Sequence, residues 1–220
     1  MSSLIHVFEK PYEHEGVFID SHFQAAAHIV CAVQDNHLGS FVEQYLSCSS
    51  SFKELRRCMP TRTPEVLSGY QKNPRKSDLG RVSSEIGNVG VALPIGTYLF
   101  HGGFWPKGWE SIKRTTAPFS TSFCPQVALR NAEHRGKAYD SGEVHIFVCR
   151  VVNPATKAFV FRHKGTRMGH EKEVLFKSGV ELVLRNKVLI CSDYRVSKVV
   201  SGTSQSEKTV PAYVLEIDIS

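Results

Sequence analysis

The chain has 220 residues, enough for one domain with a full hydrophobic core that needs no disulfide or metal staples. Apolar residues make up 41% and charged residues 22%, an ordinary globular composition that excludes disordered, collagenous and coiled-coil chains. The net charge of +6 comes from scattered Lys and Arg, which favours a basic surface over nucleic-acid binding, and no run of apolar residues is long enough to predict a membrane span.

Helical signals fill roughly the first 90 residues. After Ser21, apolar residues from Phe23 to Val33 recur at helical spacing, and Gly39 is expected to end this helix. Two later helices are expected to begin at the capping boxes Ser40 to Glu43 and Ser51 to Glu54, and a third at Thr63-Pro64-Glu65, with proline as its first helical residue. Residues 71–78 are expected to form a polar loop, and Ser77 or Asp78 to begin a short helix through Ile86.

Beyond Gly90 the chain turns to short runs rich in β-branched and aromatic residues, which predict strands. These runs are Tyr98 to His101, Phe119 to Phe123, Val144 to Val152, Ala158 to Phe161, Glu173 to Phe176, Glu181 to Leu184, Val188 to Val200 and Tyr213 to Ile217. A helix from Pro125 through Ala132 interrupts them, and Ser201 to Thr209 is expected to form a mobile polar loop. The expected class is α+β, with an N-terminal helical lobe over residues 1–90 and a mostly antiparallel β-core over 91–220.

The cysteines and histidines show no metal-binding pattern. None of the six cysteines forms a Cys-x-x-Cys pair, and the ten histidines lack the spacing of a zinc site. Buried free thiols in a reducing compartment are the better interpretation. The segment from Met1 to Asp20 has no apolar stretch of the kind found in secretory signals.

The first segment that could carry chemistry is the end of an expected strand, His101-Gly102-Gly103. Glycine after a strand lets a ligand approach the backbone, because no Cβ intervenes. A histidine in this place is more often a core or edge residue than a ligand contact. Alone, the segment leaves both interpretations open.

The second segment places three hydroxyls in a row, Ser120-Thr121-Ser122. Side chains alternate across a strand, so Ser120 and Ser122 share one face. Small hydroxyls there would leave room for a ligand and offer it hydrogen bonds. An ordinary hydroxyl-rich edge strand is the alternative.

The third segment, His170 to Phe176, pairs two carboxylates at the start of a strand, Glu171 and Glu173. The two-residue period of a strand would put both on one face, roughly 6–7 Å apart. One carboxylate could then remain ionised beside a sugar cation while the other orients or deprotonates a nucleophile. The alternative is a charged strand entry without function.

In this order, the three segments resemble the motifs of the mono-ADP-ribosyltransferase family, found in bacterial toxins and effectors and in vertebrate ectoenzymes. Ser120-Thr121-Ser122 resembles the family's Ser-Thr-Ser motif, and Glu171-Lys172-Glu173 resembles its Glu-x-Glu motif. His101-Gly102 stands where the family has arginine and glycine, and resembles the poly-ADP-ribose-polymerase-like branch instead. The resemblance implies a β-sandwich core of the ADP-ribosyltransferase type.

The resemblance also implies cleavage of the nicotinamide–ribose bond of NAD, a co-substrate, without a metal. Glu173 would stabilise the ribosyl cation, and Glu171 would face the acceptor and help to remove its proton. Ser120 would support the nicotinamide ribose or orient Glu173, while Thr121 and Ser122 would shape the pocket. All three hydroxyl residues would therefore contribute to NAD binding.

The remaining NAD contacts implied by the resemblance come from the first motif and from a basic side chain. His101 would contact the adenosine ribose, and Gly102 would hold the carboxamide through its backbone. Phe123 could stack on nicotinamide, although a core phenylalanine is the favoured interpretation. The pyrophosphate would be met by one of three arginines, Arg114, Arg130 or Arg135.

The resemblance implies a protein acceptor modified on arginine or threonine, with ubiquitin as one candidate, and a loop from Arg162 to His170 that helps to choose it. An effector delivered to a host cytosol without a Sec signal is the expected setting, with no membrane partner. Two other functions remain open: an NAD glycohydrolase that transfers to water, and a binding module that has lost its chemistry. Transfer to nucleic acid has only the net charge in its favour.

Overall fold

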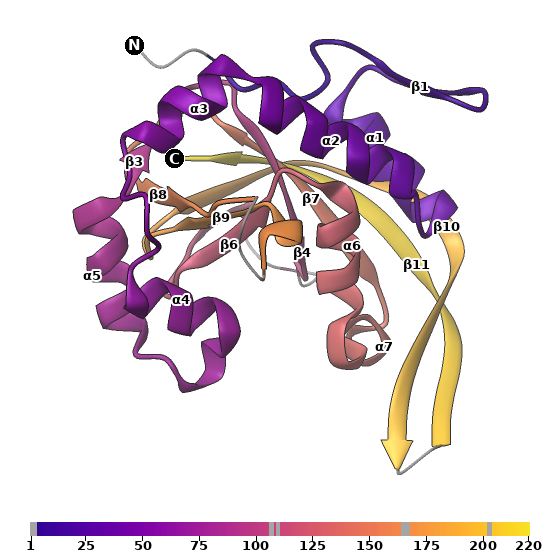
Figure 1. The fold of residues 1–220 in the computed structure, drawn as a ribbon. Helices are drawn as coiled ribbons and strands as arrows, with labels where there is room; N and C mark the ends of the chain where they lie inside the picture. Colours follow the sequence, from indigo (N-terminus) through magenta and orange to yellow (C-terminus); the bar gives the residue numbers. More distant parts are fainter. Residues whose placement is uncertain (1–3, 106–107, 109–110, 164–167, 202–203) are drawn as a thin grey trace.

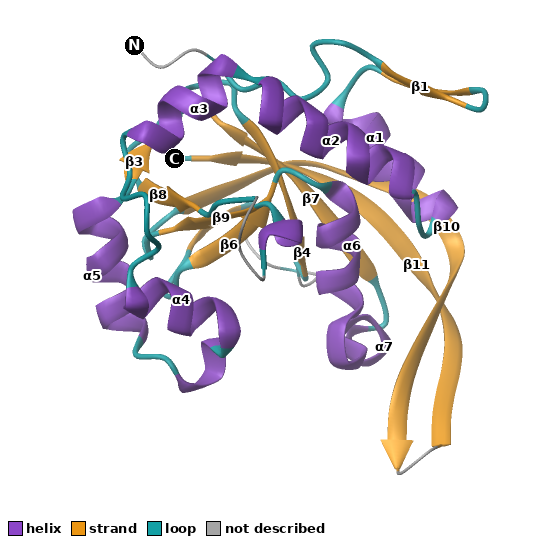
Figure 2. Ribbon diagram, viewed as in Figure 1, coloured by secondary structure: helices purple, strands orange, loops and turns teal. Residues whose placement is uncertain are grey.

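The computed structural model describes residues 4–105, 108, 111–163, 168–201 and 204–220. After a short β-hairpin, helices dominate the first part of the chain and strands dominate the rest, with most strand pairs antiparallel (Figures 1 and 2). The expected α+β class is confirmed. In the described part of the chain, no helix is long and apolar enough to cross a membrane.

The N-terminal part is built mainly from helices. They are α1 (His22–Ala32), α2 (Asn36–Cys48), α3 (Ser50–Arg57), α4 (Glu65–Lys72) and α5 (Leu79–Val89), with a 3₁₀ turn η1 (Pro74–Lys76) between the last two. Side-chain oxygens of Ser21, Asp35, Ser49 and Asp78 accept backbone N–H groups at four of the helix starts, which satisfies donors that the first turn leaves free. A separate hairpin of β1 (Tyr12–His14) and β2 (Val17–Ile19) precedes them.

The first helix ends earlier than the sequence predicts. Helix α1 stops at Ala32, because Val33 adopts a positive φ of 62° and so cannot continue the helix. Asp35 then caps α2, and Gly39 lies inside that second helix. The expectation that Gly39 ends α1 is therefore wrong.

Both predicted capping boxes are displaced from the true helix starts. Ser40 lies inside α2, where its hydroxyl donates to the Asn36 carbonyl rather than capping a new helix. Ser49, not Ser51, caps α3. Pro64 occupies the cap position of α4 rather than its first turn.

Nine described strands form one hydrogen-bonded sheet. They are β3 (Val91–Ala92), β4 (Tyr98–Gly103), β5 (Ile112–Arg114), β6 (Phe119–Ser122), β7 (Val144–Val151), β8 (Lys157–Val160), β9 (Glu173–Phe176), β10 (Glu181–Ser201) and β11 (Ser204–Ile219). Their order across the sheet is β3-β8-β9-β6-β4-β7-β11-β10-β5, and β7 and β11 run parallel while the other described pairs are antiparallel. Apolar residues of the helices and of the sheet, such as Leu38, Leu67 and Leu99, belong to one buried core.

The two halves of this sheet meet through a single residue pair, Phe100 of β4 and Ser122 of β6. On one side lie β3, β8, β9 and β6, and on the other β4, β7, β11, β10 and β5. Because the ladder between β4 and β6 is limited to this pair, the two strands diverge beyond it. The expected sandwich therefore takes the form of one sheet whose halves separate next to His101 and Ser120.

Helix α6 (Pro125–Glu133) begins where the sequence predicts and packs directly on β4. A Cβ atom at Gly102 would lie 1.8 Å from the carbonyl oxygen of Ala128 and 2.5 Å from the backbone nitrogen of Ala132. Only glycine allows the strand and the helix to approach this closely. After α6, a turn η2 (His134–Gly136) leads into the short helix α7 (Lys137–Ser141).

The prediction of a mobile polar loop over residues 201–209 is wrong. Strands β10 and β11 pair along a long hairpin, and β11 begins at Ser204, so Arg195 to Ser201 face Ser204 to Thr209 across it. Figure 1 shows the hairpin projecting beyond the rest of the molecule. Its charged and hydroxyl side chains are mostly exposed, so backbone hydrogen bonds rather than burial hold this arm together.

Candidate functional site

The centre of the candidate site is the carboxylate of Glu173, at the start of β9. It is only 7% exposed and accepts two hydrogen bonds, of 2.7 Å from Ser120 Oγ and of 2.9 Å from Gln71 Nε2. Burial raises the pKa of Glu173 to about 7, and the charge of Glu171 adds to this rise, while the two hydrogen bonds oppose it. The site thus holds a fixed carboxylate that changes protonation near neutral pH.

Glu171 does not share a strand with Glu173, which corrects the geometry expected from the sequence. It ends a 3₁₀ turn, η3 (Gly169–Glu171), and Lys172 has a φ of 47° and a ψ of 39°. This left-handed residue interrupts the extended backbone, so the two-residue period of a strand does not apply. Glu171 is half-buried, and burial raises its pKa.

The three hydroxyls of β6 have different partners. Ser122 Oγ donates to the carbonyl oxygen of Glu171 at 2.6 Å, and Thr121 Oγ1 donates to that of Val174 at 2.9 Å. Both bonds join β6 to the backbone of the stretch from Glu171 to Val174. Ser120 is the hydroxyl of the three that reaches a carboxylate side chain.

His101 lies beside Ser120, at the point where β4 and β6 separate. Its Nδ1 is 2.6 Å from the Ser120 carbonyl oxygen, and its ring lies between Phe119 and Phe147, with centroids 4.5 and 5.2 Å away. Burial lowers the pKa of His101 to about 4, with a smaller contribution from the positive charge of Lys137. The imidazole is therefore neutral at pH 7, with Nδ1–H as donor to the carbonyl and Nε2 as an acceptor.

Basic groups from two parts of the chain gather around Lys137, whose positive charge acts on His101. The pKa of Lys137 is lowered by burial and then by the charges of Arg75 and Arg135, so these three cations lie close enough to repel one another. Arg75 comes from the turn after α4, whereas Arg135 and Lys137 follow α6. Such a cluster suits an anionic group next to the histidine.

The structure also places three other side chains that the sequence singled out for this site. Arg114 lies on the edge strand β5 and pairs with Glu181 at 3.1 Å. Arg130 is exposed on α6. Phe123 is 1% exposed and packs edge-on against Phe52, with ring centroids 5.8 Å apart, so it is a core residue, as favoured.

A cavity of about 460 Å³ opens beside Gln71, between α4 and the segments that flank the Glu-x-Glu turn. It is lined by Thr61, Arg62, Thr63, Ser68, Gln71, Lys72, Arg162 and Met168. Of the predicted acceptor loop from Arg162 to His170, residues 164–167 lie outside the described residues.

Sequence reasoning missed Gln71, because residues 71–78 read as a polar loop. Leu67 and Tyr70 are both buried, and their three-residue spacing is a helical signal that would have extended α4 through Gln71. Tyr70 also lies near the carboxylate: burial raises its pKa, and the charge of Glu173 raises it further.

The described residues contain no group of three or more His, Cys, Asp or Glu side chains that could hold a metal ion. All six cysteines are described and free of disulfides. Cys124 and Cys149 are buried as expected, but Cys31, Cys48 and Cys58 are exposed, so the expectation of generally buried thiols is wrong.

No protein family and no curated protein matches the sequence. Among solved structures, the chain is similar to the enzymatic component C2-I of the C2 toxin from Clostridium botulinum, at 11% identity and a TM-score of 0.37, over 89% of this chain and 45% of that one. It is also similar to Vis toxin, an ADP-ribosyltransferase from Vibrio splendidus (14% identity, TM-score 0.39, 97% of this chain and 89% of that one). A third is C3stau2 from S. aureus with NAD (11% identity, TM-score 0.43, 76% and 92%). The chain spans less than half the length of C2-I, and likeness at these values carries no argument about activity.

Proposed function

We propose that the chain is an NAD-dependent protein mono-ADP-ribosyltransferase. The observation that carries the proposal is the buried Glu173 carboxylate, bound by Ser120 and placed next to His101 where β4 and β6 separate. Three motifs far apart in the sequence thereby meet at one point, in the combination that the sequence resemblance requires.

The chemistry assigned to Glu173 follows from its charge and its surroundings. Breaking the bond between nicotinamide and the ribose C1′ sends the electron pair to nicotinamide and leaves positive charge on the ribose. An ionised carboxylate in a dry, fixed position stabilises that charge more in the transition state than in the ground state. Ser120, which donates to Glu173, keeps the carboxylate aimed without reorganisation during the reaction.

NAD would be held on the side of His101. The neutral ring can accept a hydrogen bond from a ribose hydroxyl through Nε2, since Nδ1 donates to the Ser120 carbonyl. Arg75, Arg135 and Lys137 offer positive charge to the pyrophosphate. The backbone of Gly102 would bind the carboxamide of nicotinamide.

The acceptor would approach from the side of Glu171. Its nucleophilic atom forms the new bond to C1′, and Glu171 takes the proton that this atom loses. Burial already raises the pKa of Glu171, which makes it a better base at neutral pH. Arginine and threonine side chains are the candidate acceptors, with ubiquitin as one candidate protein and a host cytosol as the proposed setting.

The decisive experiment is incubation of the purified chain with NAD labelled in the adenylate, in the presence of a cell lysate. We expect nicotinamide release together with a labelled protein band, whose modified side chain mass spectrometry identifies. Nicotinamide release without a labelled band would instead assign the chain as an NAD glycohydrolase. Neither product in a correctly folded sample would contradict the proposal and favour an inactive binding module.

A further inference from the structure

The residue between the two carboxylates, Lys172, is buried although it is a lysine. Only 7% of it is exposed, and lysine is almost never buried to this extent unless its ammonium has a partner. Its Nζ donates to the carbonyl oxygen of His170 at 3.3 Å and lies 3.7 Å from Oε2 of Glu43, on α2. The ammonium is therefore held between the η3 turn and α2 rather than in solvent.

Lys172 also has a backbone conformation that favours glycine. Its φ of 47° and ψ of 39° lie in the left-handed region, which glycine adopts without the steric cost that a Cβ atom adds. Strained residues of this kind persist where their surroundings fix them, and they gather at functional sites. A lysine in place of glycine indicates that the side chain itself has a role at this position.

The backbone around Lys172 is fixed from the side of β6. Ser122 Oγ donates to the Glu171 carbonyl at 2.6 Å, and the Phe123 N–H donates to the Lys172 carbonyl at 3.2 Å. Within the turn, the Glu171 N–H donates to the Met168 carbonyl at 3.1 Å. The Glu171 carboxylate itself has no hydrogen bond to a described residue, and burial is what raises its pKa. Its direction therefore depends on the conformation of the turn.

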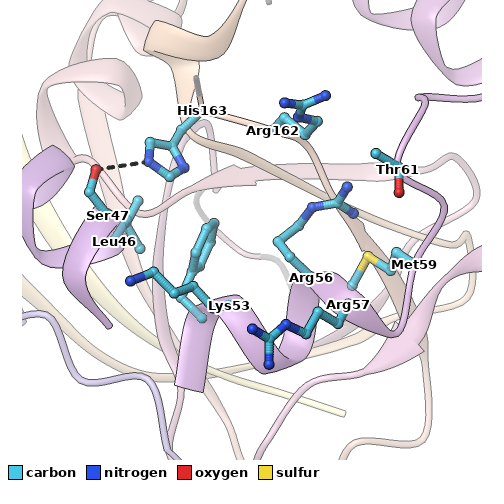
Figure 3. Close-up of a pocket in the computed structure, with 10 residues that line it drawn as sticks. Leu46, Ser47, Lys53, Arg56, Arg57, Met59, Thr61, Arg162 and His163 are labelled. Atoms are coloured by element: carbon cyan, nitrogen blue, oxygen red, sulfur yellow. Dashed lines mark hydrogen bonds between the residues drawn. The ribbon is translucent and has the colours of Figure 1, made fainter. Parts of the chain in front are cut away.

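Glu43, the partner of Lys172, belongs to a part of α2 that is itself held in place. One turn further along the helix, Ser47 Oγ donates to the Glu43 carbonyl at 2.7 Å and lies 3.1 Å from His163 Nε2. Figure 3 shows the contact of Ser47 with His163 beside a cavity of about 500 Å³, to which α2, α3 and the residues after β8 contribute. The carboxylate that faces Lys172 thus projects from a helix anchored to the sheet side of the molecule.

We propose that Lys172 is a positioning residue, whose ion pair with Glu43 holds the η3 turn and so keeps the Glu171 carboxylate directed at the acceptor. The inference rests on the proposed transferase function. In the transfer step the acceptor atom forms its bond to the ribose C1′, the bond to nicotinamide breaks with its electron pair, and the acceptor proton passes to Glu171. A turn released from α2 would misplace this base for the acceptor, while water could still react.

The chain offers a matched control for an ion pair that only stabilises the fold. Lys187 Nζ lies 2.7 Å from Glu143 Oε2, and this lysine is also partly buried. It is on β10, and four strands separate β10 from β9 in the sheet. Loss of either ammonium should lower stability, but only the loss of Lys172 should change how the site divides NAD between acceptor and water.

The hold on the turn is tested without NAD, by amide hydrogen exchange of the chain in its native form and as Lys172→Met, which removes the charge and keeps an unbranched side chain. The Glu171 amide, bonded to Met168, should exchange at least about tenfold faster in Lys172→Met, the effect of losing one interaction with a charged group. Glu43→Gln should have the same effect, and it removes a half-exposed group, so it serves if Lys172→Met does not fold. Lys187→Met should leave this amide unchanged. Unchanged exchange in a folded Lys172→Met or Glu43→Gln would overturn the proposal.

The consequence for transfer is tested with labelled NAD and a lysate, as the ratio of labelled acceptor to released nicotinamide. Lys172→Met and Glu43→Gln should each lower this ratio on the order of tenfold or more, because a small misplacement of a reacting group is costly, while nicotinamide release falls much less. Lys187→Met should keep the native ratio. A proportionate loss of both activities in Lys172→Met would mean that the lysine only supports the site as a whole, which overturns the positioning role.

Lys172→Gly separates the ammonium from the backbone conformation. It removes the charge but suits the left-handed φ, so it should lower the ratio as Lys172→Met does. A native ratio in Lys172→Gly would show that the backbone conformation alone is needed, and would overturn the role of the ion pair. Absence of nicotinamide release from the native chain would contradict the transferase function alone, since hydrogen exchange measures the hold on the turn without it.

Discussion

Gln71 of α4 and Glu173 of β9 lie 102 positions apart in the sequence and are joined by a hydrogen bond of 2.9 Å. Through this bond the helical part of the chain forms one wall of the candidate site. With Ser120 on the other oxygen, both carboxylate oxygens have a donor before any substrate arrives. A ribose hydroxyl must therefore join or replace one of these two donors.

Removing the Gln71 donor should shift the pH dependence of catalysis. In Gln71→Ala the carboxylate loses one of the two hydrogen bonds that oppose the effect of burial, so the pKa of Glu173 should rise above its value of about 7. The apparent pKa of kcat/KM for nicotinamide release reports this shift. Gln205→Ala, at an exposed position of β11, is the matched control and should leave the profile in place. An unchanged profile in Gln71→Ala would show that the bond has no part in setting the pKa.

Nicotinamide release by the native chain should increase with pH across neutrality. The ionised form of Glu173 is the active one, and with a pKa of about 7 its population grows about tenfold between pH 6 and pH 8. Burial holds the pKa of His101 at about 4, so the histidine stays neutral over the same range and NAD affinity should not change with it. Titration of NAD by calorimetry separates the two effects. A steep loss of affinity with rising pH, absent in His101→Gln, would show instead that a protonated histidine binds phosphate.

Glu173→Gln should lower the rate of nicotinamide release and raise the stability of the fold above neutral pH. Loss of the charge should reduce the rate on the order of 100-fold or more, because no other group replaces it beside the ribose. The pKa of Glu173 is raised in the folded state, so the native protein binds this proton more tightly than the unfolded chain, and its stability falls as pH rises from about 4.5 to about 7. The substitution removes this loss, and we expect a gain on the order of 2 kcal/mol at pH 8 that shrinks toward pH 5.

Urea unfolding at the two pH values measures this gain, and nicotinamide release measures the rate. Ser122→Ala tests whether any change near β6 has the same effect, since its hydroxyl binds backbone and not the carboxylate. A Glu173→Gln variant as active as the native chain would refute the assigned role.

The second carboxylate should separate transfer from hydrolysis. In Glu171→Ala we expect labelling of the acceptor to fall about 100-fold, the size of a typical general-base contribution. Nicotinamide release should persist, because water can take the place of the acceptor and Glu173 remains. Equal loss of both activities would mean that Glu171 holds the η3 turn or Glu173 in place rather than serving the acceptor.

The sequence predicted most strands, helix α6 and the order of the three motifs, because these depend on local patterns of apolar, β-branched and hydroxyl residues. It could not place Gln71 beside Glu173, since that contact depends on how α4 packs against the sheet. The sequence also could not predict the direction in which Glu171 points relative to Glu173, because no sequence pattern indicates that Lys172 adopts a left-handed conformation. The end of the β10–β11 hairpin was not predicted for a related reason. Its exposed polar residues have the composition of a loop, and they form strands because they pair with each other across the hairpin.

Alanine substitutions of the adjacent glycines at the end of β4, Gly102 and Gly103, should have different effects on stability and on NAD binding. In Gly102→Ala the new Cβ would meet backbone atoms of α6 at 1.8 and 2.5 Å, so strand and helix must move apart. In Gly103→Ala the nearest atom is Nε2 of the His101 ring at 2.4 Å, which can turn away. We therefore expect Gly102→Ala to lower the free energy of unfolding by about 3 kcal/mol, the upper end of the usual cost of overpacking. Gly103→Ala should cost less stability but weaken NAD binding by displacing His101.

Urea unfolding of both variants gives the two stabilities, and calorimetric titration of NAD gives the affinities. His101→Gln is the reference for Gly103→Ala, because both variants disturb the same ring nitrogen, and their losses of affinity should be of similar size. Once His101 is glutamine, adding Gly103→Ala should have little further effect, since the two changes act through one contact. If instead the two losses add, Gly103 acts on NAD independently of the histidine, and the place given to His101 in the binding site is wrong.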